Sequence, residues 1–214
     1  AMIVVWCVFN GFEDELRRRF LASNPHIILY RFPSGLRDYE RWEEKVKKEF
    51  ADDIVATSPF IYHETMAQKG SIMHAAIVRG TVPDRREKVQ SLEAIVRPPE
   101  ALKQLQDELQ KGQDKGALPK VIVGKGLLSY LQGEVGGTIK LVEPTREGFG
   151  PLRDFQVIGV IDSGLMRYDN RQIVMSLRTA QSFFKMGRRV TGLEVGLVEP
   201  WDSPDVAARM SQAY

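Results

Sequence analysis

The sequence has few of the residues that build metal sites and covalent cross-links. Its 214 residues include one cysteine, Cys7, and three histidines, His26, His63 and His74. A single cysteine excludes an intramolecular disulfide framework and a cysteine-based structural zinc site. The histidines fall on separate predicted strands with no ligand spacing, so we expect packed or surface side chains. The sequence therefore predicts neither a metal site nor a cofactor.

An excess of charge and a long apolar run are also missing. Thirty Lys and Arg residues against 28 Asp and Glu residues leave a net charge of +2, which argues against a dedicated nucleic-acid binder. The apolar run Met2 to Phe9 has eight residues, whereas a membrane-spanning helix needs roughly 20. It also lacks the basic start and small-residue cleavage site of a signal peptide. We interpret this run as the last turns of a membrane helix, with an N-terminal core strand as the alternative.

Known catalytic motifs are absent as well. The turn Val123–Gly126 follows a predicted strand, but a phosphate-binding loop requires a glycine at position 119 and Ser or Thr after the lysine. The sequence has Pro119 and Gly126 there. The stretch 162–170 lacks the alternating ligands of a calcium loop. We therefore expect a tight structural turn, a polar loop and no catalytic residue; a small cytosolic enzyme using the turn remains the rival interpretation.

The first 22 residues have the pattern of a charged helix. Asn10 and Glu13 have the spacing of a capping box, and acid-to-base pairs follow at i,i+4. Phe9, Phe12 and Leu16 form one narrow apolar stripe. This pattern predicts a membrane-proximal stalk helix over residues 1–22, with an ordinary amphipathic surface helix as the alternative.

The rest of the chain predicts a mixture of strands and helices, and hence an α+β fold. The Lys69-Gly70 turn favours a hairpin, and residues 83–86 read as a basic turn in a mobile segment, 81–117. The predicted strands are 26–32, 54–67, 71–80, 120–124, 138–142, 155–161, 172–175 and 193–198. The predicted helices are 38–52, 99–111, 127–131, 178–186 and 204–213.

Several dispersed motifs resemble one known family. Residues 8–16 read Val-Phe-Asn-Gly-Phe-Glu-Asp-Glu-Leu and are followed by Asn24-Pro25-His26-Ile27. Further motifs occur in the family's order at 121–127, 138–144, 155–159, 163–169 and 186–193. Together they resemble permease subunits of the lipoprotein-releasing (Lol) ABC transporters, of the LolC and LolE type. The match covers most of the chain and is weakest over 81–117.

The resemblance implies a fold and a cellular role. The fold would be a MacB-type periplasmic core domain, with a split Porter-like α+β subdomain at 23–80 and 190–214. A β-rich Sabre-like subdomain would be inserted at 81–189. The domain would lie in the periplasm of a bacterium, with flanking helices in the inner membrane. It would work with a second permease subunit, a cytoplasmic ATPase, a lipoprotein substrate and a periplasmic carrier chaperone, and would itself hydrolyse nothing.

The resemblance also implies contact residues. A hook for the carrier corresponds to the segment Pro144 to Pro151, with Arg146 and Phe149 at its tip. A basic pad corresponds to Lys140 and Arg153. The stalk residues Phe9, Phe12 and Leu16 would face the lipoprotein. Whether this subunit receives the carrier or faces the substrate stays open, and a related MacB-type exporter or mechanotransmitting permease is the alternative function.

Overall fold

The computed structural model describes residues 25–30, 35–87, 89, 92–113, 116–145 and 148–213. The predicted stalk helix, with Phe9, Phe12 and Leu16, lies outside this range. The strands are β1 (Ile27–Tyr30), β2 (Ile54–Lys69), β3 (Ile72–Thr81), β4 (Val96–Arg97), β5 (Lys120–Gly124), β6 (Thr138–Thr145), β7 (Gly148–Ile161), β8 (Gln172–Ser176) and β9 (Gly192–Leu197). The helices are α2 (Tyr39–Glu49), α3 (Pro83–Glu87), α4 (Glu100–Lys111), α5 (Lys125–Tyr130), α6 (Met166–Asp169), α7 (Leu177–Phe183) and α8 (Ser203–Ala213), with the 3₁₀ turn η1 at Pro200–Asp202.

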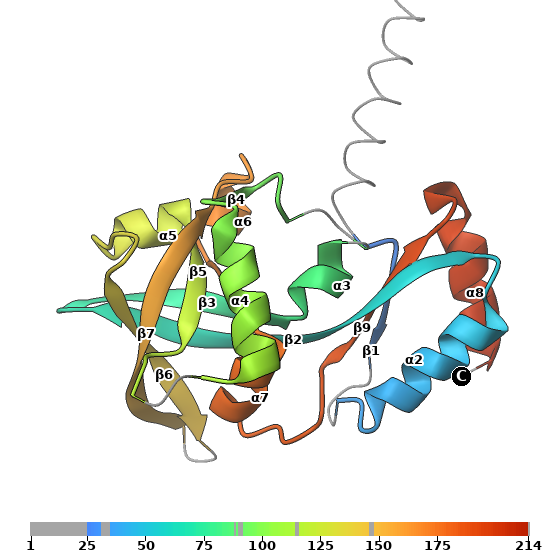
Figure 1. Cartoon of the computed structure of the whole chain (residues 1–214), viewed down its shortest axis with the longest axis horizontal. Helices are drawn as coiled ribbons and strands as arrows, with labels where there is room; N and C mark the ends of the chain where they lie inside the picture. The colour runs from blue at the N-terminus through green and yellow to red at the C-terminus, as the bar shows by residue number, and fades with distance from the viewer. Residues whose placement is uncertain are drawn as a thin grey trace, which may run out of the picture.

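The long strand β2 joins two parts of the molecule (Figure 1). Its first half, from Ile54 to Phe60, pairs antiparallel with β9, which in turn pairs with β1. Its second half, from Ile61 to Lys69, pairs with β3. From β3 the sheet continues through β8, β5, β7 and β4, and β6 bridges β2 and β7. We call the part around β1 and β9 the small lobe and the part around β5, β7 and β8 the large lobe.

Two helices cover one face of the small lobe. Helix α2 follows from the spacing of Trp42, Val46 and Phe50, which places apolar side chains on one stripe. Val46 is fully buried and Phe50 is nearly so. They pack with α8 against the sheet, as the right side of Figure 1 shows. The core residues of this lobe are Ile27, Val46, Phe50, Val195, Leu197, Val206 and Met210.

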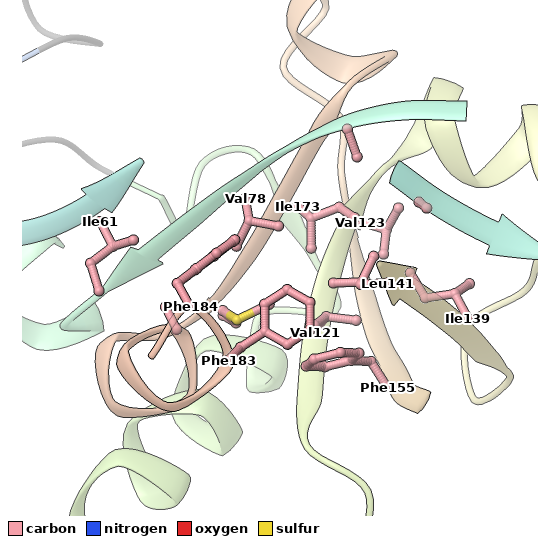
Figure 2. Close-up of a cluster of buried hydrophobic side chains, with 14 of the residues drawn as sticks. Ile61, Val78, Val121, Val123, Ile139, Leu141, Phe155, Ile173, Phe183 and Phe184 are labelled. Carbon is pink, nitrogen blue, oxygen red and sulfur yellow. The ribbon is translucent and has the colours of Figure 1, made fainter. Parts of the chain in front are cut away.

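The large lobe is a sheet with both faces buried. Successive side chains of a strand point to opposite faces, and β5 shows this clearly. Val121 and Val123 join the core shared with α7 (Figure 2). Ile122 between them joins a second core, in which Leu102 and Leu105 of α4 pack. Helices therefore pack on both faces of the large-lobe sheet, and the β6–β7 hairpin extends from this sheet.

Helix α3, strand β4, helix α6 and the 3₁₀ turn η1 were not predicted from the sequence. Residues 83–86, predicted as a basic turn, belong to helix α3, and its Arg86 is only 1% exposed. The two-residue strand β4 and helix α6 were also missed; α6 lies where a polar loop was expected. Such short elements carry little local signal, because tertiary contacts rather than propensity form them. The longer predicted helices and strands are confirmed within a few residues at their ends, except that β7 begins at Gly148, well before the predicted start at position 155.

The glycine turn after β5 allows close packing of the chain against α6 and the residue that follows it. A Cβ atom on Gly124 would lie 2.1 Å from the backbone oxygen of Asp169 in α6, and one on Gly126 would lie 1.9 Å from Asn170 Oδ1. The turn therefore lets α5 pass close to α6.

We expect Gly124→Ala to lower the free energy of unfolding by about 1–3 kcal/mol, because a rigid backbone atom must shift. Urea denaturation measures this loss, and Ser129→Ala, an exposed change on α5, is the matched control. Equal stability of the Gly124→Ala variant and the parent would contradict the packing role.

Candidate partner-binding hairpin

Strands β6 and β7 form a hairpin that extends beyond the rest of the sheet, at the lower left of Figure 1. Their register pairs Lys140 with Asp154 and continues to Thr145 opposite Gly148. Strand β2 pairs with β6 only at Leu141 and Lys140. In the described part of the chain, the remainder of β6 thus has β7 as its only strand partner. The two-stranded end is held mainly at its base.

The structure brings the two predicted pad residues onto this hairpin, and both are ion-paired. Lys140 Nζ lies 2.8 Å from Asp154 Oδ1 on the neighbouring strand. Arg153 Nε lies 2.8 Å from Glu143 Oε2. The side chains of Lys140 and Arg153 are 46% and 50% exposed. Their charged heads are therefore accessible to a partner although each already has an acidic neighbour.

Glu143 is the buried centre of the hairpin base. Its side chain is only 3% exposed and pairs with both Arg153 and Lys185, which follows α7. The Lys185 hydrogen bond lowers the pKa of Glu143; burial opposes this effect, and the Arg153 charge adds to the lowering. The hydroxyl of Thr65 on β2 donates to the carbonyl of Val142 at 2.7 Å. These contacts fix the hairpin base to β2 and to the end of α7.

Glu143, Asp154 and Lys185 were not singled out from the sequence. Asp154 directly follows Arg153 in the sequence. Its pairing with Lys140 depends on the β6–β7 register, which cannot be read from the sequence. Lys185 reaches Glu143 across 42 positions, counted from the sequence numbers. Only the long-range packing of α7 brings them together.

The structure describes the remaining hook residues to different extents. Pro151 lies on β7 and is exposed. Phe149 is opposite Pro144 in the strand register, and its side chain lies outside the described part. Arg146 also lies outside the described residues. The structure thus places Lys140, Phe149, Pro151 and Arg153 on one hairpin, and their contact with a carrier stays a prediction.

A pH-dependent stability difference is expected at Glu143. Because its pKa is lower in the folded chain than in the unfolded chain, its contribution is present above the unfolded value and is lost as the pH falls through the folded value. Between pH 5 and roughly pH 3 the parent should therefore lose more stability than Glu143→Gln. Urea midpoints of both proteins across this range measure the difference. Parallel pH profiles would show that Glu143 titrates as it does in the unfolded chain.

The histidines and acidic residues form no alternative centre in the described residues. His63 stacks on Phe184 with ring centroids 4.6 Å apart, and His74 stacks on Tyr130 at 5.1 Å. Burial lowers the pKa of His63. In the same ranges no three His, Cys, Asp or Glu side chains are grouped so that they could hold a metal ion. None of the helices in these ranges has the length and the apolar character that crossing a membrane requires.

The fold and this hairpin place the chain in a known class of domain. The chain belongs to the MacB-like periplasmic core domain family, whose sequence model matches residues 1–213. It is 25% identical to the lipoprotein-releasing system transmembrane protein LolC of Neisseria meningitidis serogroup B, over 98% of this chain and 49% of that protein. It is 24% identical to LolE of Haemophilus influenzae, over 100% of this chain and 50% of that protein. The chain therefore spans about half the length of these relatives.

Solved structures share the architecture. The extracellular domain of the ABC-type transporter YknZ from Gram-positive bacteria has a TM-score of 0.56 and 13% identity, covering 86% of this chain and 90% of that one. The periplasmic region of MacB from Actinobacillus actinomycetemcomitans has a TM-score of 0.50 and 13% identity, covering 87% of this chain and 81% of that one. At this identity the likeness concerns the fold alone. The predicted α+β, MacB-type fold is confirmed.

Proposed function

We propose that this chain is the periplasmic domain of an ABC transporter permease that extracts lipoproteins from the bacterial inner membrane and passes them to a periplasmic carrier. The observation that carries the proposal is the projecting β6–β7 hairpin with its half-exposed basic residues, in a chain similar to LolC and LolE. A separate cytoplasmic ATPase would hydrolyse ATP, and a second permease subunit would complete the transporter. The domain itself would bind the lipoprotein and the carrier and position them for transfer.

The hairpin's chemistry suits a reversible protein contact. The ion pair between Lys140 and Asp154 joins two half-exposed side chains and contributes about 0–1 kcal/mol, so Lys140 can exchange Asp154 for an acidic group of a carrier at little cost. Arg153 keeps its buried partner Glu143 and would offer the exposed part of its guanidinium group to the carrier. Position 149, an aromatic residue next to the turn, would supply the apolar contact that anchors many interfaces. The fixed base at Glu143 limits the conformational entropy lost when a partner binds.

The subdomain arrangement is part of the proposal. The small-lobe core draws only on residues of 23–80 and 190–214, which supports a Porter-like unit there. The core that contains Ile122 and Leu105 lies wholly within 81–189, which supports a Sabre-like unit, and the core that contains Val121 also takes side chains from β2 and β3. Strands β2 and β3 connect the two, because β3 pairs with β8 of the large lobe. A stalk over 1–22 would present Phe9, Phe12 and Leu16 to the lipoprotein. This subunit would then combine substrate-facing and carrier-facing surfaces.

Transfer of a lipoprotein to its carrier tests the proposal. The complete transporter is reconstituted with an acylated lipoprotein, and transfer to the soluble carrier is followed with time. Lys140→Ala together with Arg153→Ala should slow transfer about tenfold or more, since both charged contacts are lost. Lys103→Ala, an exposed lysine on α4, is the control and should leave transfer unchanged. Transfer by the double variant at the parent rate would reject the hairpin as the carrier contact, whereas a parent that transfers no lipoprotein would favour a related exporter.

A further inference from the structure

A groove lined by arginines lies where the segment before α2 meets the link from α7 to β9. The backbone N–H of Leu36 donates to the carbonyl of Val190 at 2.8 Å, and the N–H of Val190 donates back at 3.1 Å. This isolated bridge holds two distant segments together. It brings Arg37 of the first segment beside Arg188 and Arg189 of the second, and Arg41 in the first turn of α2 lines the adjoining hollow.

The groove has both shape and an excess of positive charge. It consists of two hollows of about 340 and 290 Å³ that share Arg37 and Asp38 as lining residues. Trp42 lines the first hollow and Met186 lines the second, so each has an apolar wall. The arginines that line the hollows are Arg37, Arg41, Arg188 and Arg189, with Lys45 beside them.

The acidic residues nearby neutralise only part of this charge. Arg188 Nη2 lies 3.1 Å from Glu40 Oε1, but its side chain is 87% exposed and the pair is therefore weak. Arg189 Nε donates to the carbonyl of Met186 at 3.2 Å, which fixes the side chain without neutralising it. In the described part of the chain, Arg37 and Arg41 have no acidic partner within 4.0 Å. Two guanidinium groups remain ready for carboxylates, which they bind through paired hydrogen bonds.

We propose that this arginine-lined groove binds an acidic peptide segment of the same protein partner that the β6–β7 hairpin engages. The inference rests on the proposed function. Continuity supports it: Lys185, three positions before Arg188 in the sequence, pairs with Glu143 at the hairpin base. The concave form favours a peptide over a bilayer, because a broad flat surface does not enter two hollows of this size.

Two binding measurements on the complete permease in detergent test the groove. The first titrates a fluorescein-labelled decamer of glutamate and follows its anisotropy. The second titrates the periplasmic carrier encoded in the same genome. The variants are Arg37→Glu with Arg41→Glu for the groove, Lys140→Ala with Arg153→Ala for the hairpin, and Lys48→Glu with Lys103→Glu as the matched charge control.

The groove variant should bind both the glutamate decamer and the carrier about tenfold or more weakly, and raising the salt concentration should reduce the difference from the parent. The charge control should bind like the parent. If only the hairpin variant weakens carrier binding, the proposed function stands and the groove inference is overturned. If the parent binds no carrier, the proposed function fails, and the groove as a site for this partner fails with it.

The decamer separates a failed groove from a failed carrier contact, because the hairpin variant is expected to bind the decamer like the parent. Undiminished decamer binding by the groove variant overturns the inference regardless of the carrier result. Vesicles of phosphatidylglycerol and phosphatidylethanolamine, added as competitor, should leave decamer binding unchanged. Displacement of the decamer by these vesicles would assign the arginines to a lipid surface and overturn the peptide assignment.

Discussion

Replacing Glu194 by glutamine is expected to lower the free energy of unfolding by about 3–5 kcal/mol, as removal of one partner from a buried ion pair does. Glu194 on β9 is fully buried and pairs with Arg79 of β3 and Arg86 of α3. Arg86 is only 1% exposed. Glutamine keeps the shape of the side chain but leaves two arginines without their shared counter-charge.

Chemical denaturation of the 214-residue chain measures this loss as a lower urea midpoint. Glu199→Gln, an exposed change two residues beyond β9, is the matched control and should stay within about 0.5 kcal/mol of the parent. Equal midpoints for Glu194→Gln and the parent would show that the cluster contributes nothing. A large loss would identify it as a principal connection between the lobes.

The position of the Glu194 ion pairs explains why their loss is expected to lower the free energy of unfolding so much. Helix α3 lies between the two lobes in Figure 1. Its Arg86 binds Glu194 of the small lobe, and its Arg85 Nη1 lies 2.7 Å from Glu43 Oε2 on α2. Glu43 also accepts a hydrogen bond from Thr57 Oγ1 at 2.6 Å. Charged contacts therefore join α2, α3, β2, β3 and β9 at one place.

Phe155→Ala is expected to cost about 3–5 kcal/mol, the usual range for a large aromatic side chain removed from a core. Phe155 is 1% exposed, and its ring meets that of Phe183 edge to face with centroids 5.2 Å apart (Figure 2). Phe183 in turn meets Phe184 at 4.9 Å. The truncation would leave a cavity between β7 and α7.

The same change should also loosen the hairpin, because Phe155 is opposite Ile139 at the base of the β6–β7 pair. Thermal or urea denaturation measures the stability, and amide hydrogen exchange of β6 measures the loosening. Leu152→Ala, on the same strand but 40% exposed, is the control and should cost much less. Unchanged exchange along β6 in Phe155→Ala would separate the core from the hairpin.

Local sequence patterns predicted the longer elements because the spacing of apolar residues indicates which face of each element is buried. Trp42, Val46 and Phe50 mark one side of α2, and the uninterrupted apolar run Val121-Ile122-Val123 marks a strand buried on both faces. Helix α3 gave no such signal. Residues 83–86 were predicted to form a basic turn, whereas Arg86 is buried because Glu194, 108 positions away, faces it.

The candidate hairpin could be predicted only in outline. The resemblance indicated Lys140 and Arg153, but their acidic partners depend on strand register, and Lys185 depends on where α7 ends. The arginine-lined groove gave no sequence signal, since Leu36 and Val190 must first meet. These features depend on contacts between residues far apart in the chain, and such contacts cannot be read from a single sequence.

Photocrosslinking from position 149 tests the central claim most directly. A photoreactive amino acid is placed at 149 in the complete permease, with lipoprotein and carrier both present, and Trp201, 47% exposed on the small lobe, is the control position. We expect a carrier adduct from position 149 and none from position 201. Lipoprotein adducts from positions 9 or 12 without any carrier adduct from 149 would contradict it and would make this subunit a substrate-facing permease only.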